Sequence, residues 1–575
     1  MAGRVELKGL GASGGIAIGP AHLFRRSEEV VRCQLPPESF PSEVERPQRA
    51  AQVARQQIAE LKEKAAREHG AEEAAIFEAQ GLMLQDPELL GKAERLIMEA
   101  KCNAEWALQR VGEEVASSLE SLPDEYFGAR AADVRDVVSR VLSILQGRSG
   151  GKLGDLPGPV VVVGEELMPS DTAQADRDKL LGLVMETGSC TSHAAILART
   201  MGIPAVVGVK GVVDAVSPGD AVVVDGDTGV VVIRPSVDEL GDWQVKKEQW
   251  DRRREQLRLL ISAAAVTRDG HRVELAANIG SLEDLSSALE WGAEGIGLFR
   301  TEFLFMDREV PPSEEEQFEV YRRAVEAFSG RAVIIRTLDV GGDKPIPWLG
   351  QLVEANPFLG LRGIRLCLAR EDVFLTQLRA LLRARAHGNL WVMFPMVADV
   401  GELRAAKRLV DKAKEDLACA GVPHGDPPVG IMVEIPSAAL LIDHILQEVD
   451  FVSVGTNDLT QYTLAVDRTN ATVSCLADAL HPAVLRLIAE VARAGRRCGK
   501  WVGICGDLAG DALATPILTG FGVDELSMAP RLLPEVKEAL RATSMREAQE
   551  LSRRALACRS AAEVRQLLTQ NRQSK

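Results

Sequence analysis

The stretch VGIMVEIPSAALLIDHILQEVDFVSVGTNDL, residues 429–459, decides the fold of the C-terminal half of the chain. Two short apolar runs, VGIMV and FVSV, lie on either side of a helix-like segment, and polar residues follow each run. The same alternation of strand and helix continues from residue 266 to residue 575. The expected strands lie within VELAANI, GIGLFRTEFLF, AVIIRTLDVG, WVMFPMV, VGIMVEIPSA, FVSVGTNDL, WVGICGDLAG and ELSMAP. Eight such strands over roughly 300 residues predict a (β/α)8 barrel of the TIM type, with its site at the C-terminal ends of the strands.

Charged and polar residues gather where these strands end. The set consists of Arg300, Glu302, Arg336, Asp339, Glu434, Asn457, Asp458 and Cys505. A barrel that served only as a scaffold would not collect these groups at one end, because unpaired buried charge is costly. We therefore predict a functional site at this end of the barrel.

The cations near this site predict an anionic ligand. Guanidinium groups match phosphate and carboxylate with two parallel hydrogen bonds, so a small polyanion is the expected ligand. The cations that would hold it are Arg300, Arg336, Lys344 and Arg468. Any phosphate site must be local, because a formal net charge of -16 argues against a nucleic-acid-binding surface on the molecule as a whole.

Glu434 and Asp458 predict a metal site on two successive strands. Two hard oxygen donors are the usual number with which a protein holds Mg²⁺, while substrate oxygens and water complete the shell. A metal and arginines around a phosphate ester that bears a carboxylate are suited to phosphoryl transfer and to stabilising an enolate. Cys505 could then protonate an enolate carbon as a general acid. The alternative is a buried structural cysteine.

In the N-terminal half, the segment TGSCTSHAAILARTMGIPAVVG, residues 187–208, places His193 directly before an apolar helical run. We expect Ser189, Thr191 and Ser192 to cap the helix AAILART, whose N–H groups and dipole would stabilise negative charge beside the imidazole ring. A neutral imidazole in this position is suited to carry a phosphoryl group. The alternative is a surface or packing histidine.

The pattern along the whole chain predicts a multidomain α/β protein. Gly-rich strands at the start and again after residue 148 predict one α/β domain, and Ala-, Glu- and Leu-rich runs between them predict an inserted helical bundle. A helical linker follows, with Trp243, Trp250 and Leu257 on one face. The expected domains are the α/β domain (1–30 and 148–238), the inserted bundle (31–147), the linker (239–265) and the barrel (266–575).

Composition limits the class of protein further. Nine cysteines are scattered without a CxxC pair or metal-ligand spacing, which predicts reduced thiols and no disulfides. No stretch approaches the roughly 18 apolar residues of a membrane span, and the first residues lack the apolar core of a signal peptide. We expect a cytoplasmic protein that neither inserts into a membrane nor binds nucleic acid.

At these residues the sequence resembles enzyme I of the bacterial phosphoenolpyruvate-dependent sugar phosphotransferase system. The resemblance runs nearly end to end, through MPSDTAQ, TSHAAILART, GIGLFRTEFLFMDR, IIRTLDVGGDK, EANPFLGLRGIR, MVEIPSA, GTNDLTQYTLAVDR and CGDLAGD. It implies that the α/β domain swivels and carries a phosphohistidine, and that the helical insert binds the phosphocarrier protein HPr. It also implies that the barrel binds phosphoenolpyruvate and Mg²⁺ and forms a homodimer.

The resemblance also implies the role of each site residue. His193 would accept the phosphoryl group from phosphoenolpyruvate, with Thr172 as a hydrogen-bond partner, and pass it to a histidine of HPr as the first step of sugar uptake. Cys505 would protonate the enolate to give pyruvate. The residues that would hold phosphoenolpyruvate are Arg300, Arg336, Lys344, Arg362, Asn457 and Arg468, and those that would hold Mg²⁺ are Glu434 and Asp458.

Two other functions stay open at this point. Pyruvate phosphate dikinases and phosphoenolpyruvate synthases look alike in the phosphohistidine domain and the barrel, but they carry a large nucleotide-binding domain. Here only residues 40–147 fall outside those parts, without a phosphate-binding loop. A non-catalytic protein that senses phosphoenolpyruvate or binds a phosphocarrier is the second alternative. The sequence departs from the family pattern at Asp507, commonly Glu, and at Gln80, often His.

Overall fold

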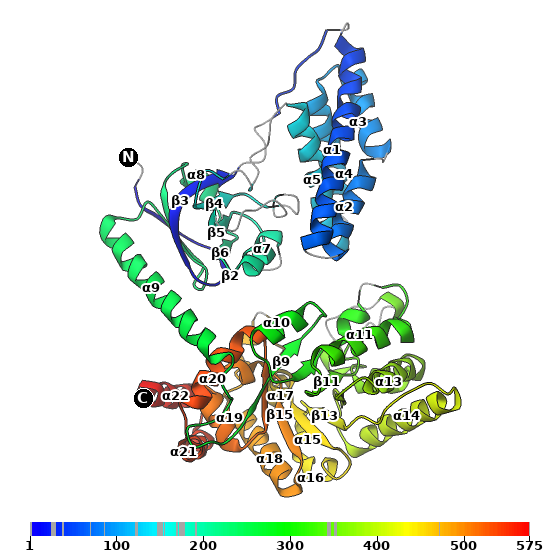
Figure 1. Ribbon diagram of the computed structural model, residues 1–575, viewed down its shortest axis with the longest axis vertical. Helices are drawn as coiled ribbons and strands as arrows, with labels where there is room; N and C mark the ends of the chain where they lie inside the picture. Colours follow the sequence, from blue (N-terminus) through cyan, green and yellow to red (C-terminus); the bar gives the residue numbers. More distant parts are fainter. Residues whose placement is uncertain are drawn as a thin grey trace. The chain divides into compact units, whose positions relative to one another are not determined.

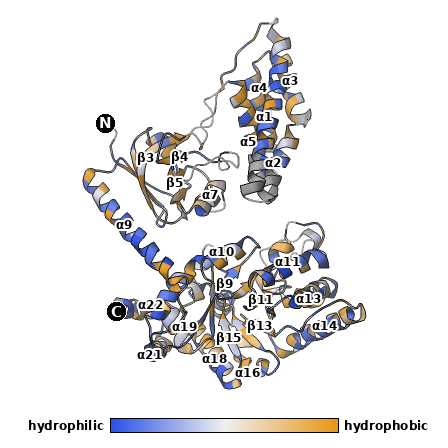
Figure 2. Ribbon diagram, in the orientation of Figure 1, coloured by the Kyte–Doolittle hydropathy of each residue, from blue (hydrophilic) through white to orange (hydrophobic). Residues whose placement is uncertain are grey.

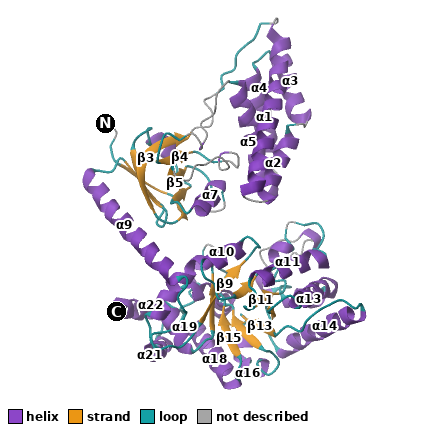
Figure 3. Ribbon diagram, in the orientation of Figure 1, coloured by secondary structure: helices purple, strands orange, loops and turns teal. Residues whose placement is uncertain are grey.

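Two units make up the chain, residues 1–254 and residues 255–575 (Figure 1). The first contains a β-sheet and a bundle of helices, and the second contains a barrel of strands surrounded by helices (Figure 3). The computed structural model describes residues 3–24, 30–36, 39–68, 71–84, 87–120, 125–146, 153, 156–167, 171, 179–189, 192–306, 308–341, 347–349, 354–470 and 472–573.

The sheet of the first unit takes its strands from both sides of the helical insert. β3 (Ile16–Phe24) connects the two parts, because it pairs in parallel with β4 (Val160–Gly164) and antiparallel with β7 (Ala221–Asp225). The strand order is β1-β8-β7-β3-β4-β5-β6-β2. The other strands are β1 (Val5–Lys8), β2 (Leu10–Ser13), β5 (Leu180–Met185), β6 (Ala205–Val207) and β8 (Val230–Ile233). The predicted union of the two β-rich segments in one sheet is confirmed.

The chain between β3 and β4 forms the predicted helical bundle. Along its first helix, Ala50, Ala54 and Ile58 are buried at a spacing of four residues, which is the spacing of one helix face. Valine, leucine and alanine side chains of the other helices complete this core. The helices are α1 (Phe40–Glu68), α2 (Ala71–Met83), α3 (Pro87–Ala100), α4 (Ala104–Glu120) and α5 (Glu125–Leu145).

Further helices among the described residues follow along the chain and lead to the second unit. They are α7 (His193–Met201), α8 (Val212–Ala215) and α9 (Val237–Leu260). α9 has no buried residue and is largely hydrophilic (Figure 2). Its half-buried residues include the predicted stripe, Trp243, Trp250 and Leu257. The helix predicted over 239–265 ends earlier, at Leu260. The carbonyl of the next residue, Ile261, accepts a hydrogen bond of 2.9 Å from Nζ of Lys537.

All eight strands predicted for the C-terminal half are present, and they form a closed parallel barrel, β9 to β16. They are β9 (Glu274–Ile279), β10 (Ile296–Phe299), β11 (Val333–Arg336), β12 (Leu390–Phe394), β13 (Val429–Val433), β14 (Phe451–Val454), β15 (Trp501–Ile504) and β16 (Glu525–Met528). The segment GIGLFRTEFLF is shorter as a strand than predicted. Its strand ends at Phe299, and Glu302–Leu304 form a 3-10 turn that places polar residues at the barrel mouth.

Helices cover the outside of the barrel, as the alternating sequence pattern predicts. They are α10 (Asp284–Glu290), α11 (Glu314–Ala327), α12 (Ile364–Ala369), α13 (Glu371–Arg385), α14 (Val400–Cys419), α15 (Pro436–Leu440), α16 (Ile442–Ile445), α17 (Thr456–Leu464), α18 (Pro482–Cys498), α19 (Thr515–Phe521), α20 (Leu533–Arg541), α21 (Met545–Ala557) and α22 (Ala561–Gln573). Valine, isoleucine and leucine side chains between strands and helices form the largest core of the chain.

A second apolar cluster fills the lower part of the barrel interior. Trp391, Phe451 and Trp501 pack against one another, with ring centroids 4.9 to 6.0 Å apart. Apolar strands run through the centre of the barrel in Figure 2. This part of the barrel interior is therefore a packed core of side chains.

Two further observations bear on the expectations drawn from composition. Each cysteine that the structure describes is a free thiol. Within the described part of the chain, no helix has the length and apolar character needed to cross a bilayer.

Candidate functional site

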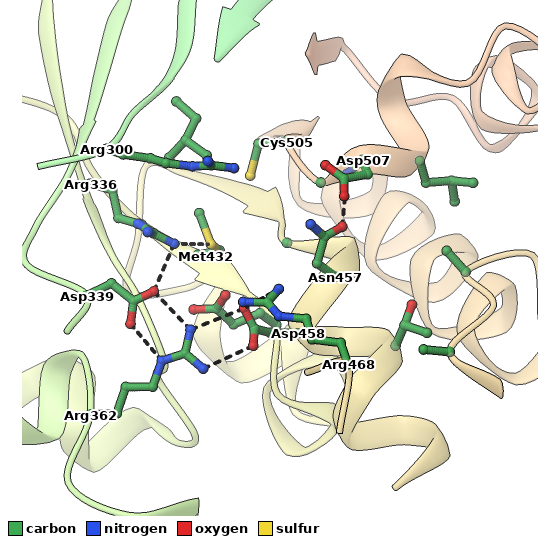
Figure 4. A pocket seen from close by; sticks show the side chains of 18 of the residues that line it. Arg300, Arg336, Asp339, Arg362, Met432, Asn457, Asp458, Arg468, Cys505 and Asp507 are labelled. Atoms are coloured by element: carbon green, nitrogen blue, oxygen red, sulfur yellow. Dashed lines mark hydrogen bonds and ion pairs between the residues drawn. The ribbon is translucent and has the colours of Figure 1, made fainter. Parts of the chain in front are cut away.

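A cavity of about 550 Å³ opens at the C-terminal ends of the barrel strands (Figure 4). Nine of the residues predicted from the sequence line this cavity: Arg300, Arg336, Asp339, Arg362, Glu434, Asn457, Asp458, Arg468 and Cys505. Lys344 lies outside the described residues. The strand ends therefore bring together, in one place, nearly the whole set that was predicted for the barrel.

Two of the arginines are held by carboxylates before any ligand is bound. Arg336 donates to Glu302 over 2.6 Å and forms an ion pair of 3.0 Å with Asp339. Arg362 bonds both carboxylate oxygens of Asp339 and both of Asp458, over 3.0 to 3.2 Å. The guanidinium groups of Arg336 and Arg362 bind carboxylates in this structure, and their contact with an anionic ligand stays a prediction.

The charges in this network stabilise one another although they are buried. Burial alone would lower the pKa of Arg336, but Glu302 and Asp339 outweigh it and raise that pKa above its ordinary value. The same balance, with Asp339 and Asp458, raises the pKa of Arg362. Both arginines stay charged, and they fix the positions of the carboxylates around them.

The positive charge that faces the open cavity comes from Arg300 and Arg468. Arg300 is exposed and forms no ion pair with any residue that the structure describes. Its side chain extends towards Cys505 in Figure 4. Arg468 makes only a long contact of 3.7 Å with Asp458, and 37% of its side chain is exposed. These two guanidinium groups are available to an anionic ligand.

Glu434 and Asp458 fit a divalent cation at the edge of this cavity. Oε1 of Glu434 accepts a hydrogen bond of 2.7 Å from the backbone N–H of Met396, which adopts φ +58° to donate it. Oε2 of Glu434 is buried and accepts no hydrogen bond from any residue that the structure describes. A Cβ at Gly455 would lie 3.0 Å from that oxygen, so the glycine leaves space beside it.

The acids around the predicted metal site are also electrostatically suited to a cation. Burial first, and then the nearby charges of Asp458 and Asp339, raise the pKa of Glu434 above its ordinary value. Among the described residues, no cluster of three or more His, Cys, Asp or Glu is arranged to hold a metal by itself. Two carboxylates with one unpartnered oxygen fit a hard cation such as Mg²⁺ that takes its other ligands from substrate and water.

Cys505 lies at the inner end of the cavity and is 2% exposed. Its Sγ donates weakly to the carbonyl of Val454 over 3.7 Å, and burial raises the pKa of the thiol to about 12. Its carbonyl accepts a hydrogen bond of 2.9 Å from the side-chain amide of Asn278, which fixes the strand end. The thiol therefore stays protonated at neutral pH and faces the cavity as a proton donor would.

The departures from the family pattern receive a structural explanation. Asn457 accepts a hydrogen bond of 2.9 Å from the backbone N–H of Asp507, whose side chain is exposed. Because the backbone makes this contact, the change from Glu to Asp does not alter it. Gln80 is fully buried, and its amide donates to Asp136 over 3.1 Å and to Asp133 over 3.5 Å. It therefore lies inside the helical bundle and not on its surface.

The segment around His193 is described only in part. His193 is the first residue of α7, which ends at Gly202 in the left-handed conformation, φ +66°. Ser192 is the N-cap residue but makes no side-chain capping bond, and its hydroxyl is buried without a partner. The capping prediction is therefore wrong for Ser192. Thr191 and Thr172 lie outside the described residues.

The cavity residues that were not predicted from the sequence include two apolar ones on barrel strands β10 and β13. Leu298 and Met432 line its inner wall, and Sδ of Met432 lies 3.6 Å from Nη1 of Arg336. Each precedes a predicted site residue by two positions, Arg300 and Glu434. Alternation along a strand places residues two apart on one face, so that spacing was the signal that could have found them.

The sequence matches three family models of the phosphoenolpyruvate (PEP)-utilising enzymes. They are the N-terminal model over residues 8–130, the mobile-domain model over residues 156–229 and the PEP-binding-domain model over residues 254–545. The order of the three models is the order of the helical insert, the α/β domain and the barrel in the chain.

Similar proteins extend over nearly the whole chain. The phosphoenolpyruvate-protein phosphotransferase of Staphylococcus carnosus (strain TM300) is 44% identical over 566 residues, which cover 97% of this chain and 98% of that protein. The protein of the same name from Bacillus subtilis (strain 168) is 43% identical over 560 residues, with 97% and 98% covered. A solution structure of Enzyme I (nEIt) protein is 40% identical, covers 43% of this chain and 99% of its own, and has a TM-score of 0.36. This chain therefore belongs to the PEP-utilising enzymes and, within them, to the family of phosphoenolpyruvate-protein phosphotransferases.

Proposed function

We propose that this enzyme transfers the phosphoryl group of PEP to its own His193 and then to a histidine of the phosphocarrier protein HPr. Pyruvate is released, and the transfer is the first step of sugar uptake by the phosphotransferase system. The observation that carries this proposal is the barrel cavity, which combines two available guanidinium groups, two acids suited to a cation and a protonated thiol.

PEP binds at the mouth of the barrel through its phosphate and carboxylate. Arg300 and Arg468 provide the charge that faces the cavity, and the amide of Asn457 is positioned by the backbone of Asp507. Arg336 and Arg362 hold the carboxylates of Glu302 and Asp458 in place. They also bind the substrate when its anionic groups compete with these carboxylates for the guanidinium N–H groups. Lys344, which follows β11 in the sequence, is a further candidate for binding PEP.

Glu434 and Asp458 would hold Mg²⁺ at this site. When bound, the ion neutralises charge on the substrate oxygens and polarises the enolate oxygen. Asp458 is already fixed by Arg362, and Glu434 by the backbone of Met396, so both acids are oriented without the ion. That orientation reduces the cost of assembling the site when PEP arrives.

The chemistry then divides between two residues. The imidazole of His193 attacks phosphorus in line, so that an N–P bond forms as the bond from phosphorus to the enol oxygen of PEP breaks. Thr172 is the proposed hydrogen-bond partner of that imidazole. The Cys505 thiol gives its proton to the enolate carbon, which yields pyruvate and a thiolate. The α/β domain then swivels to present phospho-His193 to HPr on the helical insert.

The proposal also covers the assembly and location of the enzyme. The expected domains are the α/β domain (1–30 and 148–238), the insert (31–147), the linker (239–265) and the barrel (266–575). The enzyme acts in the cytoplasm as a homodimer joined through the barrel domain.

Pyruvate release in the presence of PEP, Mg²⁺ and HPr tests the proposal. We expect several pyruvate molecules per enzyme, in proportion to the HPr supplied, and no effect of ATP. A protein that binds PEP but releases no pyruvate would be a sensor. Pyruvate formation that depends on AMP and pyrophosphate, and that yields ATP, would instead indicate a dikinase.

A further inference from the structure

Behind the barrel mouth, four buried polar side chains form a hydrogen-bonded chain that the proposed reaction does not use. Gln317 and Tyr321 lie on α11, Gln377 lies on α13, and Thr301 follows β10. The two helices pack side by side on the outside of the barrel (Figure 1). None of the four residues is more than 1% exposed. Polar groups buried this deeply cost free energy unless they are bonded, so their partners indicate what they hold in place.

Gln377 joins the segments that follow β10 and β11. Its Oε1 accepts a hydrogen bond of 2.9 Å from the backbone N–H of Leu338, which lies two residues beyond the end of β11. Its Nε2 donates over 3.3 Å to Oγ1 of Thr301, which lies two residues beyond the end of β10. The Thr301 hydroxyl in turn donates over 3.0 Å to the carbonyl of Arg336. One side chain from α13 therefore connects both strand ends.

The direction of each hydrogen bond in this chain is fixed from its two ends. Nε2 of Gln317 donates over 3.1 Å to the carbonyl of Pro312, which can only accept, so Oε1 of Gln317 faces Tyr321. Burial raises the pKa of Tyr321, so its hydroxyl keeps its proton and donates to that oxygen over 3.2 Å. The hydroxyl then accepts from Nε2 of Gln377 over 3.1 Å, while a backbone N–H occupies Oε1 of Gln377. Only an amide at this position supplies both the donors and the acceptor that its neighbours require.

The two connected segments carry residues of the proposed PEP site. Thr301 lies between Arg300, whose guanidinium faces the cavity, and Glu302, which pairs with a buried arginine. Leu338 directly precedes Asp339, whose carboxylate pairs with two arginines. The register pairs of β10 and β11 end one residue before Arg300. Beyond that point, side-chain hydrogen bonds connect the two segments.

We propose that Gln377 is a positioning residue that fixes the spacing of Arg300 and Asp339 for PEP, an inference that rests on the function proposed for the cavity. Gln377 is not among the residues that line the cavity, so it acts through Thr301 and the backbone of Leu338. A group misplaced by about 1 Å can cost about 100-fold in rate. Loss of these bonds therefore weakens PEP binding, although every residue that contacts PEP is intact.

The test compares Gln377→Met with Gln317→Met in the full-length enzyme. Both changes replace a buried glutamine of the same hydrogen-bonded chain with an apolar side chain of similar size, so both should lower stability in chemical denaturation. Among the described residues, however, Gln317 bonds only Tyr321 and the carbonyl of Pro312. Gln377→Met should raise Kd for PEP about tenfold, and Gln317→Met by less than about twofold. Calorimetric titration of PEP with Mg²⁺ in a His193→Ala background measures Kd without phosphoryl transfer.

Steady-state kinetics with His193 present separate a positioning role from a structural one. Gln377→Met should raise KM for PEP about tenfold and change kcat by less than about threefold, because the groups it displaces hold the bound substrate. A change that only destabilised the fold would lower the amount of active enzyme, and so the apparent kcat, at unchanged KM. Thr301→Val removes the hydroxyl at nearly constant shape and should raise KM in the same way. Thr301→Ser keeps the hydroxyl and should hold KM within about twofold of the parent value.

Two results would overturn the role of Gln377. In one, Gln377→Met binds PEP as tightly as the parent sequence. In the other, Gln317→Met weakens binding to the same extent, which indicates a general disturbance of the fold. If Gln377→Met does not fold, the Thr301 pair decides, and equal KM values for Thr301→Val and Thr301→Ser contradict the proposal.

The titration also separates this inference from the function on which it rests. An enzyme that releases pyruvate while Gln377→Met keeps the parent Kd refutes the inference and leaves the function standing. An enzyme that binds PEP but releases no pyruvate refutes the proposed phosphoryl transfer, and the Kd of Gln377→Met still decides the role of Gln377. Absence of PEP binding by the parent enzyme would contradict both.

Discussion

The mouth of the barrel and the start of α7 carry the two halves of the proposed reaction, and they are built in opposite ways. At the mouth, Arg362 binds Asp339 and Asp458 at once, so the acids are fixed before a ligand arrives. At α7, Ser192 provides no capping bond to the first N–H groups of the helix. The acids of the mouth are thus oriented by arginine and backbone bonds, whereas the hydroxyl of Ser192 contributes no such bond at the start of α7.

The largest effect is expected when an acid of the mouth loses its charge. Glu434→Gln removes one of the two carboxylates suited to Mg²⁺ and should lower kcat for pyruvate release by about 1000-fold. The backbone bond from Met396 can still be accepted by the amide oxygen, so the fold should persist. Glu448→Gln, on the barrel surface, is the matched control and should retain full activity. Similar activities for the two variants would show that Glu434 at the barrel mouth takes no part in the reaction.

Thiol labelling tests how strongly the mouth is shielded. Burial raises the pKa of Cys505 to about 12, so its reactive thiolate is scarce at pH 8. Iodoacetamide should modify Cys505 at least about 100-fold more slowly than the exposed Cys498, as measured by peptide mass mapping. The rate at Cys505 should rise about tenfold per pH unit, because the thiolate fraction grows as pH approaches the pKa. Rapid labelling of Cys505 at pH 8 would show that the site is open.

Substitutions of two arginines at the mouth should affect different properties, one the stability of the fold and the other the binding of PEP. Arg336→Met leaves Glu302 without its buried partner and Asp339 with Arg362 alone, and it should lower the free energy of unfolding by about 3 kcal/mol. Arg300→Met removes an exposed guanidinium, so it should leave that free energy nearly unchanged and raise KM for PEP by about tenfold. Chemical denaturation and steady-state kinetics measure the two effects. Equal destabilisation by both variants would refute the division of roles.

The smallest effect is expected at the start of α7. Ser192→Ala should change the rate of His193 phosphorylation by less than about twofold, because the hydroxyl makes no capping bond that alanine would lose. Phosphoenzyme formation followed by rapid quench measures this rate. A loss of tenfold would show that Ser192 caps the helix during the reaction, and the contrast between the two sites would then fail.

Much of the barrel and of its site could be predicted from the sequence. Short apolar runs that alternate with amphipathic helices define the strands. Because all strands of the barrel are parallel, the polar residues that follow them lie at the same end of the barrel. Arg300, Glu434, Asn457 and Cys505 were found in this way, and all of them line the cavity. Their positions follow from local patterns, which a single sequence displays.

What the sequence could not predict depends on pairing through space. Arg336 and Arg300 look equivalent as strand-end arginines, but only Arg336 has Glu302 and Asp339 within bonding distance. Ser192 has the residue type of a helix cap without the capping bond.

The most direct test of the central claim is the intact mass of the enzyme after incubation with PEP and Mg²⁺, compared with the His193→Ala variant. The account predicts one acid-labile phosphoryl group on the parent and none on the variant, while both still bind PEP at the barrel. No phosphoryl group on a parent enzyme that binds PEP, or an equal adduct on His193→Ala, would contradict it.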